Sequence, residues 1–87
     1  MKTKTRNLLK KHTRDMIRWQ LRMRNRLLTC GVTKSEADGF SVVTLPHRDV
    51  RNGTVEIFRD LASALQRHAA IVNELRSTGW SIASYTQ

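Results

Sequence analysis

The organisation of this chain depends most on residues 5–30, which have the sequence TRNLLKKHTRDMIRWQLRMRNRLLTC. The stretch contains no Pro and no Gly, and most of its residues favour helices. Gly31 follows it, at the place where a helix commonly ends. We therefore predict one long N-terminal helix within residues 1–30.

Such a helix would have an apolar face and a cationic face. The broad apolar face would consist of Leu8, Leu9, His12, Met16, Trp19, Met23, Leu27 and Cys30. The opposite face would carry Lys11, Arg14, Arg18 and Arg22, with Arg26 at its margin. A narrower apolar strip of Ile17, Leu21 and Leu28 lies beside Lys10, and one sheet could not easily cover both strips. This second strip favours a further contact, such as a homodimer.

The charge of the chain is concentrated in its first third. Residues 1–30 contain ten basic residues and one acidic residue, Asp15, whereas residues 31–87 contain six of each. The formal net charge of +9 therefore belongs to the N-terminal segment. Because Arg suits forked contacts to phosphates and carboxylates, we expect a partner with a negatively charged surface.

The rest of the chain alternates strand and helix signals. Residues 31–39 contain the capping-box pattern Thr33-Lys34-Ser35-Glu36, which predicts a connecting helical turn. Residues 40–45 and 54–58 predict a β-hairpin, closed either by an Asn52-Gly53 turn or by a longer loop over 47–53. Asp60 is expected to cap a second helix that ends at Gly79, followed by a strand from Trp80. The apolar positions of that helix are Leu61, Leu65, His68, Val72 and Leu75.

These elements predict an α+β fold of one small domain, residues 1–87. The expected order is α-β-β-α-β: a basic amphipathic helix (1–30), a connecting turn (31–39) and a ββαβ core (40–87). A small antiparallel sheet would be covered by the helices.

Two functions fit the basic segment. The first is a non-enzymatic accessory or regulatory protein that binds the phosphate backbone of DNA or RNA through Lys10, Lys11, Arg14, Arg18, Arg22 and Arg26. Arg48 and Arg51 form a secondary possible contact. The second is a regulator or inhibitor that lays the helix on an acidic protein surface, with Ile17, Leu21 and Leu28 as partner or dimer contacts. A targeting segment or membrane-surface helix is a third interpretation.

Other classes find no support in the sequence. Cys30 is the only cysteine, and no secretory or membrane-spanning stretch is visible, so a cytoplasmic protein is expected. His12, His68 and Cys30 lack the short spacings of metal ligands. The sequence contains no Gly-rich phosphate loop, no paired carboxylates and no nucleophile motif. We therefore predict that the protein is not an enzyme and has no cofactor. Trp19 and Trp80 are expected in the core.

Overall fold

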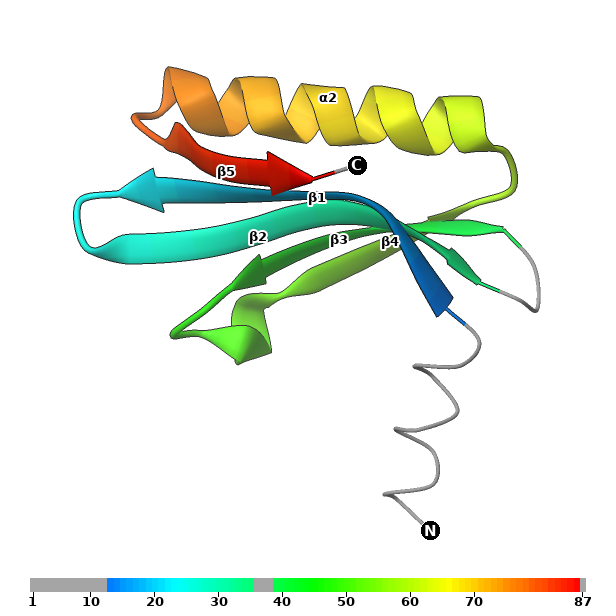
Figure 1. The fold of residues 1–87 in the computed structure, drawn as a ribbon, viewed down its shortest axis with the longest axis horizontal. Helices are drawn as coiled ribbons and strands as arrows, with labels where there is room; N and C mark the ends of the chain where they lie inside the picture. The colour runs from blue at the N-terminus through cyan, green and yellow to red at the C-terminus, as the bar shows by residue number, and fades with distance from the viewer. Residues whose placement is uncertain (1–12, 36–38, 87) are drawn as a thin grey trace, which may run out of the picture.

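The computed structural model describes residues 13–35 and 39–86 as an antiparallel sheet with a helix lying across one face (Figure 1). The elements are β1 (Thr13–Met23), β2 (Arg26–Ser35), β3 (Phe40–Pro46), the 3-10 turn η1 (Val50–Asn52), β4 (Thr54–Phe58), α2 (Leu61–Ser77) and β5 (Ser81–Thr86). The order of strands across the sheet is β4-β3-β2-β1-β5. The chain thus forms four strands in succession, crosses the sheet through α2 and returns to pair β5 with β1.

The predicted N-terminal helix is wrong wherever the structure describes it, because residues 13–23 and 26–35 form strands. In β1, Ile17, Trp19 and Leu21 alternate with Arg18 and Gln20, so a period of two places these three apolar side chains on the same face. The predicted α-β-β-α-β order is therefore replaced by the order β-β-β-β-α-β, in which all five strands form one sheet.

The apolar face of the β1–β2 hairpin packs under α2. One core cluster contains Leu21, Leu28, Cys30, Val72 and Trp80, with Trp19, Met23, Ile71 and Leu75 against it. The other contains Val32, Val42 and Ala64, with Ile17, Phe40, Phe58, Leu61 and Ile71 against it. Hence Trp19, Met23 and Cys30 of the broad apolar strip share a core cluster beneath α2 with Leu21 and Leu28 of the narrow one. Leu8, Leu9 and His12 of the broad strip lie outside the described residues.

The connecting turn predicted for residues 31–39 is also wrong where it can be seen. Thr33, Lys34 and Ser35 belong to β2 and pair with β1, while Glu36 lies outside the described residues. Gly31 is not a helix C-cap but a residue of β2 whose Cα is opposite Arg18.

The C-terminal half forms where its patterns predicted. The β3–β4 hairpin is closed by a long loop rather than by a tight Asn52-Gly53 turn, since its last paired residues are Thr44 and Thr54. Asp60 caps α2 by accepting a hydrogen bond from the Ser63 backbone N–H at 2.9 Å, and this bond lowers the pKa of the Asp60 carboxyl. Gly79, at φ 111°, follows the C-cap residue of α2. Among the described residues, no helix is both long and apolar enough to cross a membrane.

Candidate functional site

The β1–β2 hairpin carries exposed arginines around its closed end. Because Trp19 and Leu21 face α2, Arg18 and Arg22 point to the opposite, open face of the sheet. Arg24 lies in the turn, and Arg26 lies on the side of the sheet that faces α2. The hairpin therefore presents positive charge from both of its faces and from its tip.

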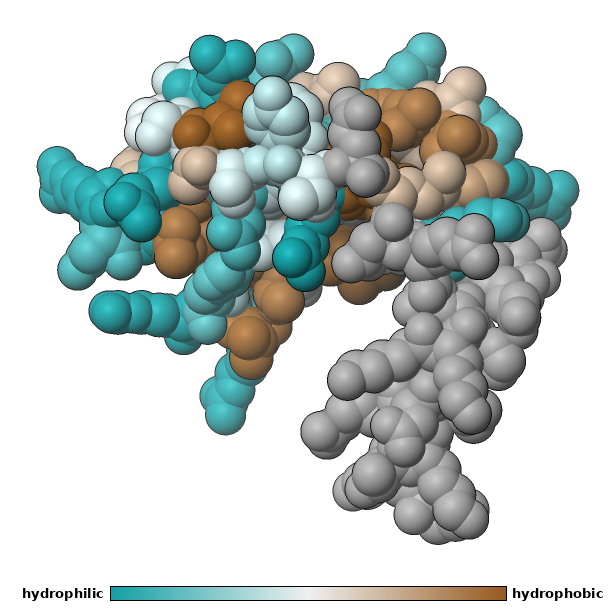
Figure 2. All heavy atoms as spheres, in the orientation of Figure 1, coloured by the Kyte–Doolittle hydropathy of each residue, from teal (hydrophilic) through white to brown (hydrophobic). Residues whose placement is uncertain are grey.

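The β3–β4 loop brings a further cation to the same end of the molecule. The His47 backbone N–H donates to the Leu27 carbonyl at 3.0 Å, which holds the start of this loop against β2. As a result, Arg48 lines the same hollow as Arg26. We call the group of Arg22, Arg24, Arg26 and Arg48 the arginine end. Hydrophilic side chains project from the end of the molecule where the β1–β2 turn lies (Figure 2).

Arg24 holds an unfavourable backbone conformation at the tip of this group. Its φ is +57°, and it is the one non-glycine residue with positive φ in the described part of the chain. A two-residue hairpin turn with positive φ at its first central position prefers glycine, and the left-handed region costs other residues about 1–2 kcal/mol. Folding alone would favour glycine here, so the cation at the tip is held at a cost to stability.

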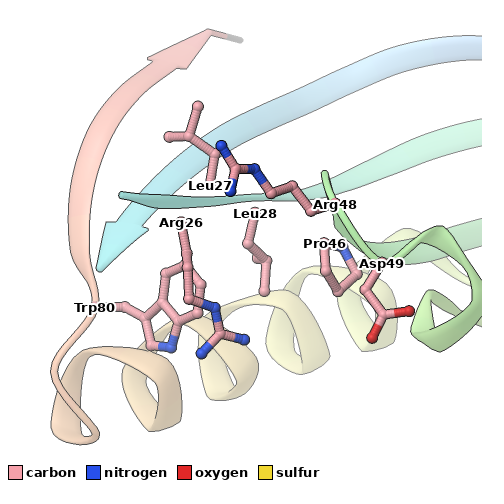
Figure 3. A pocket seen from close by; sticks show the side chains of 7 residues that line it. All are labelled: Arg26, Leu27, Leu28, Pro46, Arg48, Asp49 and Trp80. Carbon is pink, nitrogen blue, oxygen red and sulfur yellow. The ribbon is translucent and has the colours of Figure 1, made fainter. Parts of the chain in front are cut away.

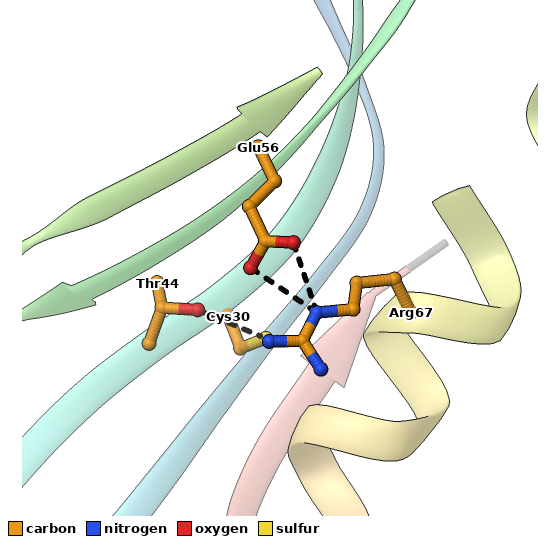
Figure 4. Close-up of polar contacts among 4 residues, drawn as sticks. All are labelled: Cys30, Thr44, Glu56 and Arg67. Atoms are coloured by element: carbon orange, nitrogen blue, oxygen red, sulfur yellow. Dashed lines mark hydrogen bonds and ion pairs between the residues drawn. The ribbon is translucent and has the colours of Figure 1, made fainter. Parts of the chain in front are cut away.

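Arg67 forms an ion pair within the fold. The Arg67 Nε–H donates to both carboxylate oxygens of Glu56, at 3.0 and 3.1 Å (Figure 4). The Glu56 carboxylate accordingly raises the pKa of Arg67. This is the only ion pair among residues 16–34 and 39–86, and it ties α2 to β4. Arg67 therefore serves the fold rather than the arginine end.

Cys30 is a fully buried thiol beneath α2. Its Sγ lies 3.8 Å from the Thr44 hydroxyl, and burial raises the pKa of the thiol although Thr44 and Arg67 act against that rise. Burial in β2 therefore makes the Cys30 thiol a weak nucleophile. Among the described residues, no three His, Cys, Asp or Glu side chains gather in a manner that could hold a metal ion.

His68 is a buried titratable group on the inner face of α2. Its Nε2 lies 3.2 Å from the Cys30 carbonyl oxygen, and its ring packs edge-on against Trp19 with centroids 5.4 Å apart. Burial lowers the pKa of His68, with the Cys30 contact acting in the opposite direction. His68 thus joins the helix to the sheet in its neutral form.

We expect the protein to lose stability as the pH falls below about 6.5, the ordinary pKa of histidine. Because the pKa of His68 is lower in the folded chain, the unfolded chain takes up a proton at a higher pH than the folded chain does. The free energy of unfolding therefore decreases with falling pH until the pH is below the pKa of His68 in the folded chain. This residue can contribute no more than about 1.4 kcal/mol per pH unit. Urea unfolding between pH 7.5 and 5.5 measures the slope. His68→Gln should be less stable at pH 7.5 but should show a shallower slope, and an unchanged slope would contradict the assignment.

The structure separates the predicted contact residues. Lys10 and Lys11 lie outside the described residues, and of Arg14 only the backbone is described, paired with Lys34. Arg18 and Arg22 share the open face, whereas Arg26 lies on the other side of the sheet. Arg48 joins the arginine end, and Arg51 is an exposed residue of η1. The predicted partner strip lies inside the fold, since Leu21 and Leu28 are core residues and Ile17 packs beside Val32.

Sequence reasoning missed Arg24 and the hollow beside Arg26. The signal for Arg24 was the pair Arg24-Asn25 between two runs of alternating polarity, which is typical of a hairpin turn. The hollow had no comparable signal, because Arg26, Arg48 and Trp80 come from three distant parts of the sequence. In comparisons with known proteins, the chain matches no protein-family model, no curated protein and no solved structure.

Proposed function

We propose that this protein binds nucleic acid without catalysing a reaction, and that it contacts the phosphate backbone through the arginine end and Arg18. The observation that carries this proposal is the convergence of Arg22, Arg24, Arg26 and Arg48 at one end of a chain whose net charge is +9. Exposed guanidinium groups bind phosphates through forked, charge-assisted hydrogen bonds. A protein of this kind would serve as an accessory or regulatory factor.

The spacing of the arginines suits an extended anion. Arg18 and Arg22 lie four residues apart on one strand, so their Cα atoms are about 13 Å apart. Arg24 extends the row around the tip, Arg26 continues it on the other side of β2, and the Arg48 side chain lies beside Leu27 (Figure 3). Such an arrangement favours a polymer of phosphates over a single small anion.

The testing experiment measures affinity for random-sequence DNA and RNA over a salt series. If the arginines neutralise four or five phosphates, the slope of log affinity against log salt is expected near roughly −4 for a duplex and roughly −3 for a single strand. Fluorescence anisotropy with labelled oligonucleotides provides the measurement. A flat response to salt would refute the proposal.

An acidic protein surface is the alternative partner, and one observation favours a protein. Val55 and Ile57 share one face of the edge strand β4 and are 62% and 74% exposed, so together they offer apolar surface beside unpaired backbone groups. Capture of a partner that survives nuclease treatment would support this alternative.

The homodimer predicted from the sequence stays a prediction. The reduced state that we expect for the buried Cys30 thiol suits the cytoplasm, where we propose that the protein acts.

A further inference from the structure

The strand β4 forms one edge of the sheet, and its outer side has no partner strand among residues 13–35 and 39–86 (Figure 1). In an antiparallel edge strand, every second residue directs its backbone N–H and C=O groups away from the sheet. Val55 and Ile57 lie on the open face of this strand, because Glu56 between them is opposite the core residue Val42. The edge therefore offers backbone hydrogen bonds and apolar contacts at the same place.

The devices that usually protect an edge strand from pairing are missing from β4. Proteins commonly place Lys, Pro or a β-bulge on such strands. Thr54–Phe58 contains neither Lys nor Pro, and its pairing with β3 runs without a register shift. The other edge strand, β5, differs, since its pairing with β1 shifts register between Gln20 and Leu21. Such a shift twists an edge and hinders the addition of a further strand, so β4 is the edge suited to pairing.

Glu56 is the one charged residue of β4, and its charge is compensated within the fold. An inward-pointing charge on an edge strand opposes pairing, because a partner strand would help to bury it. Glu56 points to the side of α2, where both of its carboxylate oxygens accept from the Arg67 Nε–H (Figure 4). The carboxylate therefore does not protect this edge as a lone charge would.

The sequence of β4 matches a second copy of itself in the antiparallel direction. When two β4 strands pair about Glu56, Val55 of each copy is opposite Ile57 of the other. Both of these apolar pairs lie on the open face beside Val43, so the apolar surface continues across the junction. A polar or charged strand from another protein would leave the same two side chains without apolar contacts.

The same register brings two Glu56–Arg67 pairs together at the twofold axis. Two carboxylates directly opposite each other would repel if they were alone. Each Glu56 arrives with its own Arg67, whose guanidinium has further N–H donors on its terminal nitrogens. The four side chains therefore bring no net charge to the junction. A face-to-face dimer would instead bury Arg18 and Arg22 of both copies between the sheets, at a large cost in desolvation.

We propose that two copies of this chain associate through antiparallel pairing of their β4 strands, so that two five-stranded sheets become one continuous sheet. The twofold axis of such a pairing is perpendicular to the sheet. Both helices then lie on one side, and the open faces of both copies lie on the other, where Arg18 and Arg22 of the two copies share one surface. This association goes beyond the proposed function and does not depend on it.

Sedimentation velocity of the full chain, from about 5 to about 500 μM, measures the association. Two paired strands of five residues bury less than about 1,200 Å², so a transient dimer with a Kd of roughly 10–100 μM is expected. The buffer should contain about 0.5 M NaCl, which screens the repulsion between two chains of net charge +9. A chain that stays monomeric over the whole range would overturn the proposal.

A lysine on the edge strand tests which surface pairs. Ile57→Lys adds the kind of side chain that protects natural edges, and it should weaken the dimer at least about tenfold. Ile57 is 74% exposed, so the Tm should stay within about 4 °C of that of the unchanged chain. Val50→Lys is the matched control, because it places the same charge on an exposed apolar residue of η1, outside β4, and it should keep the dimer. An undisturbed dimer in Ile57→Lys, or equal weakening in both variants, would contradict the pairing of β4.

Cross-linking tests the register. Residues directly opposite each other have Cα atoms about 4.5–5.5 Å apart, which suits a disulfide, whereas the diagonal neighbours are about 7–8 Å apart. A mixture of Val55→Cys and Ile57→Cys chains in a glutathione redox buffer should therefore form the mixed disulfide at least about tenfold faster than either variant alone links to itself. Cys30 is buried and its pKa is raised by burial, so it does not compete. Equal rates for the mixture and the single variants would refute pairing about Glu56.

The dimer and the proposed function fail in different measurements. A monomeric chain that still binds oligonucleotides with the expected salt slope would refute only the dimer. A dimer that shows a flat salt response with oligonucleotides would refute only the nucleic-acid function. If the chain is monomeric and Ile57→Lys loses a nuclease-resistant partner, β4 contacts another protein and the pairing of two copies is overturned.

Discussion

Replacing Gly31 with alanine is expected to lower the free energy of unfolding by about 3 kcal/mol, at the upper end of the usual cost of overpacking. A methyl group on Gly31 would lie 2.5 Å from the Ile17 carbonyl oxygen and 3.4 Å from the Arg18 Cα. Both atoms belong to the backbone of β1, so rotation of a side chain cannot relieve the contact. β1 would have to move away from β2, at the centre of the sheet.

Urea or thermal unfolding measures this effect, and a domain of this length should lose about 15 °C in Tm. Gln66→Ala is a suitable control because Gln66 is an exposed residue of α2, and it should change stability by no more than about 0.5 kcal/mol. If Gly31→Ala were as stable as the control, the close approach of β1 to Gly31 would be refuted.

The same glycine explains part of the error in the sequence analysis. A glycine after a stretch of helix formers is typical of a helix end, but Gly31 is required here because another strand passes too close for a side chain. The two explanations make the same demand on the residue type. Only the neighbouring strand β1, whose residues Ile17 and Arg18 approach Gly31, distinguishes them.

Residues 16–23, MIRWQLRM, contain the information that was overlooked. Ile17, Trp19, Leu21 and Met23 alternate with polar residues, which is a strand pattern. The helix prediction instead followed propensity, and tertiary packing overrides propensity readily. The arginines of β1 have a high intrinsic helix propensity, but they lie on the exposed face of the strand, where an arginine side chain is compatible with either backbone conformation.

In the C-terminal half, local signals and tertiary packing agreed. Asp60 and Gly79 bound α2 with capping geometry that depends on nearby residues alone. Phe40–Pro46 and Thr54–Phe58 are short runs between strong turn residues, so few alternatives compete with a hairpin. Periodicity also identified His68 and Val72 as core residues, and both are buried, whereas Leu65, which it placed on the same face, is 36% exposed.

From the sequence, the residue type that forms the candidate site could be predicted, but its arrangement in space could not. The excess of arginine is visible in the sequence, whereas its arrangement depends on which residues share a face, and this differs between a helix and a strand. On a helix Arg22 and Arg26 would be neighbours, but in the hairpin they lie on opposite sides of the sheet. Arg48 lines the same hollow as Arg26 because the β3–β4 loop folds against β2, and that loop contact has no local signal.

Replacing Arg22 and Arg24 together with glutamine is expected to lower the affinity for oligonucleotides by roughly a hundredfold at low salt. Each charge-assisted contact to a phosphate contributes at least about 1.5 kcal/mol, and two such contacts would be lost. The salt slope should become shallower by about two, since two fewer phosphates are neutralised. Anisotropy titrations over a salt series measure both quantities.

A matched control removes the same charge from the opposite end of the sheet. Lys34 is opposite Phe40 in the sheet, Phe40 is opposite Phe58, and Arg59 follows at once. Lys34→Gln with Arg59→Gln lowers the net charge equally but leaves the arginine end intact. The affinity of this double variant for oligonucleotides should fall only slightly, because charges far from the bound phosphates are screened within about 10 Å at 0.1 M salt. If both double variants lost affinity equally, net charge rather than the arrangement of arginines would control binding. A specific loss in Arg22→Gln with Arg24→Gln is the result that the geometry requires, because these two side chains continue the row from Arg18 to the hairpin tip.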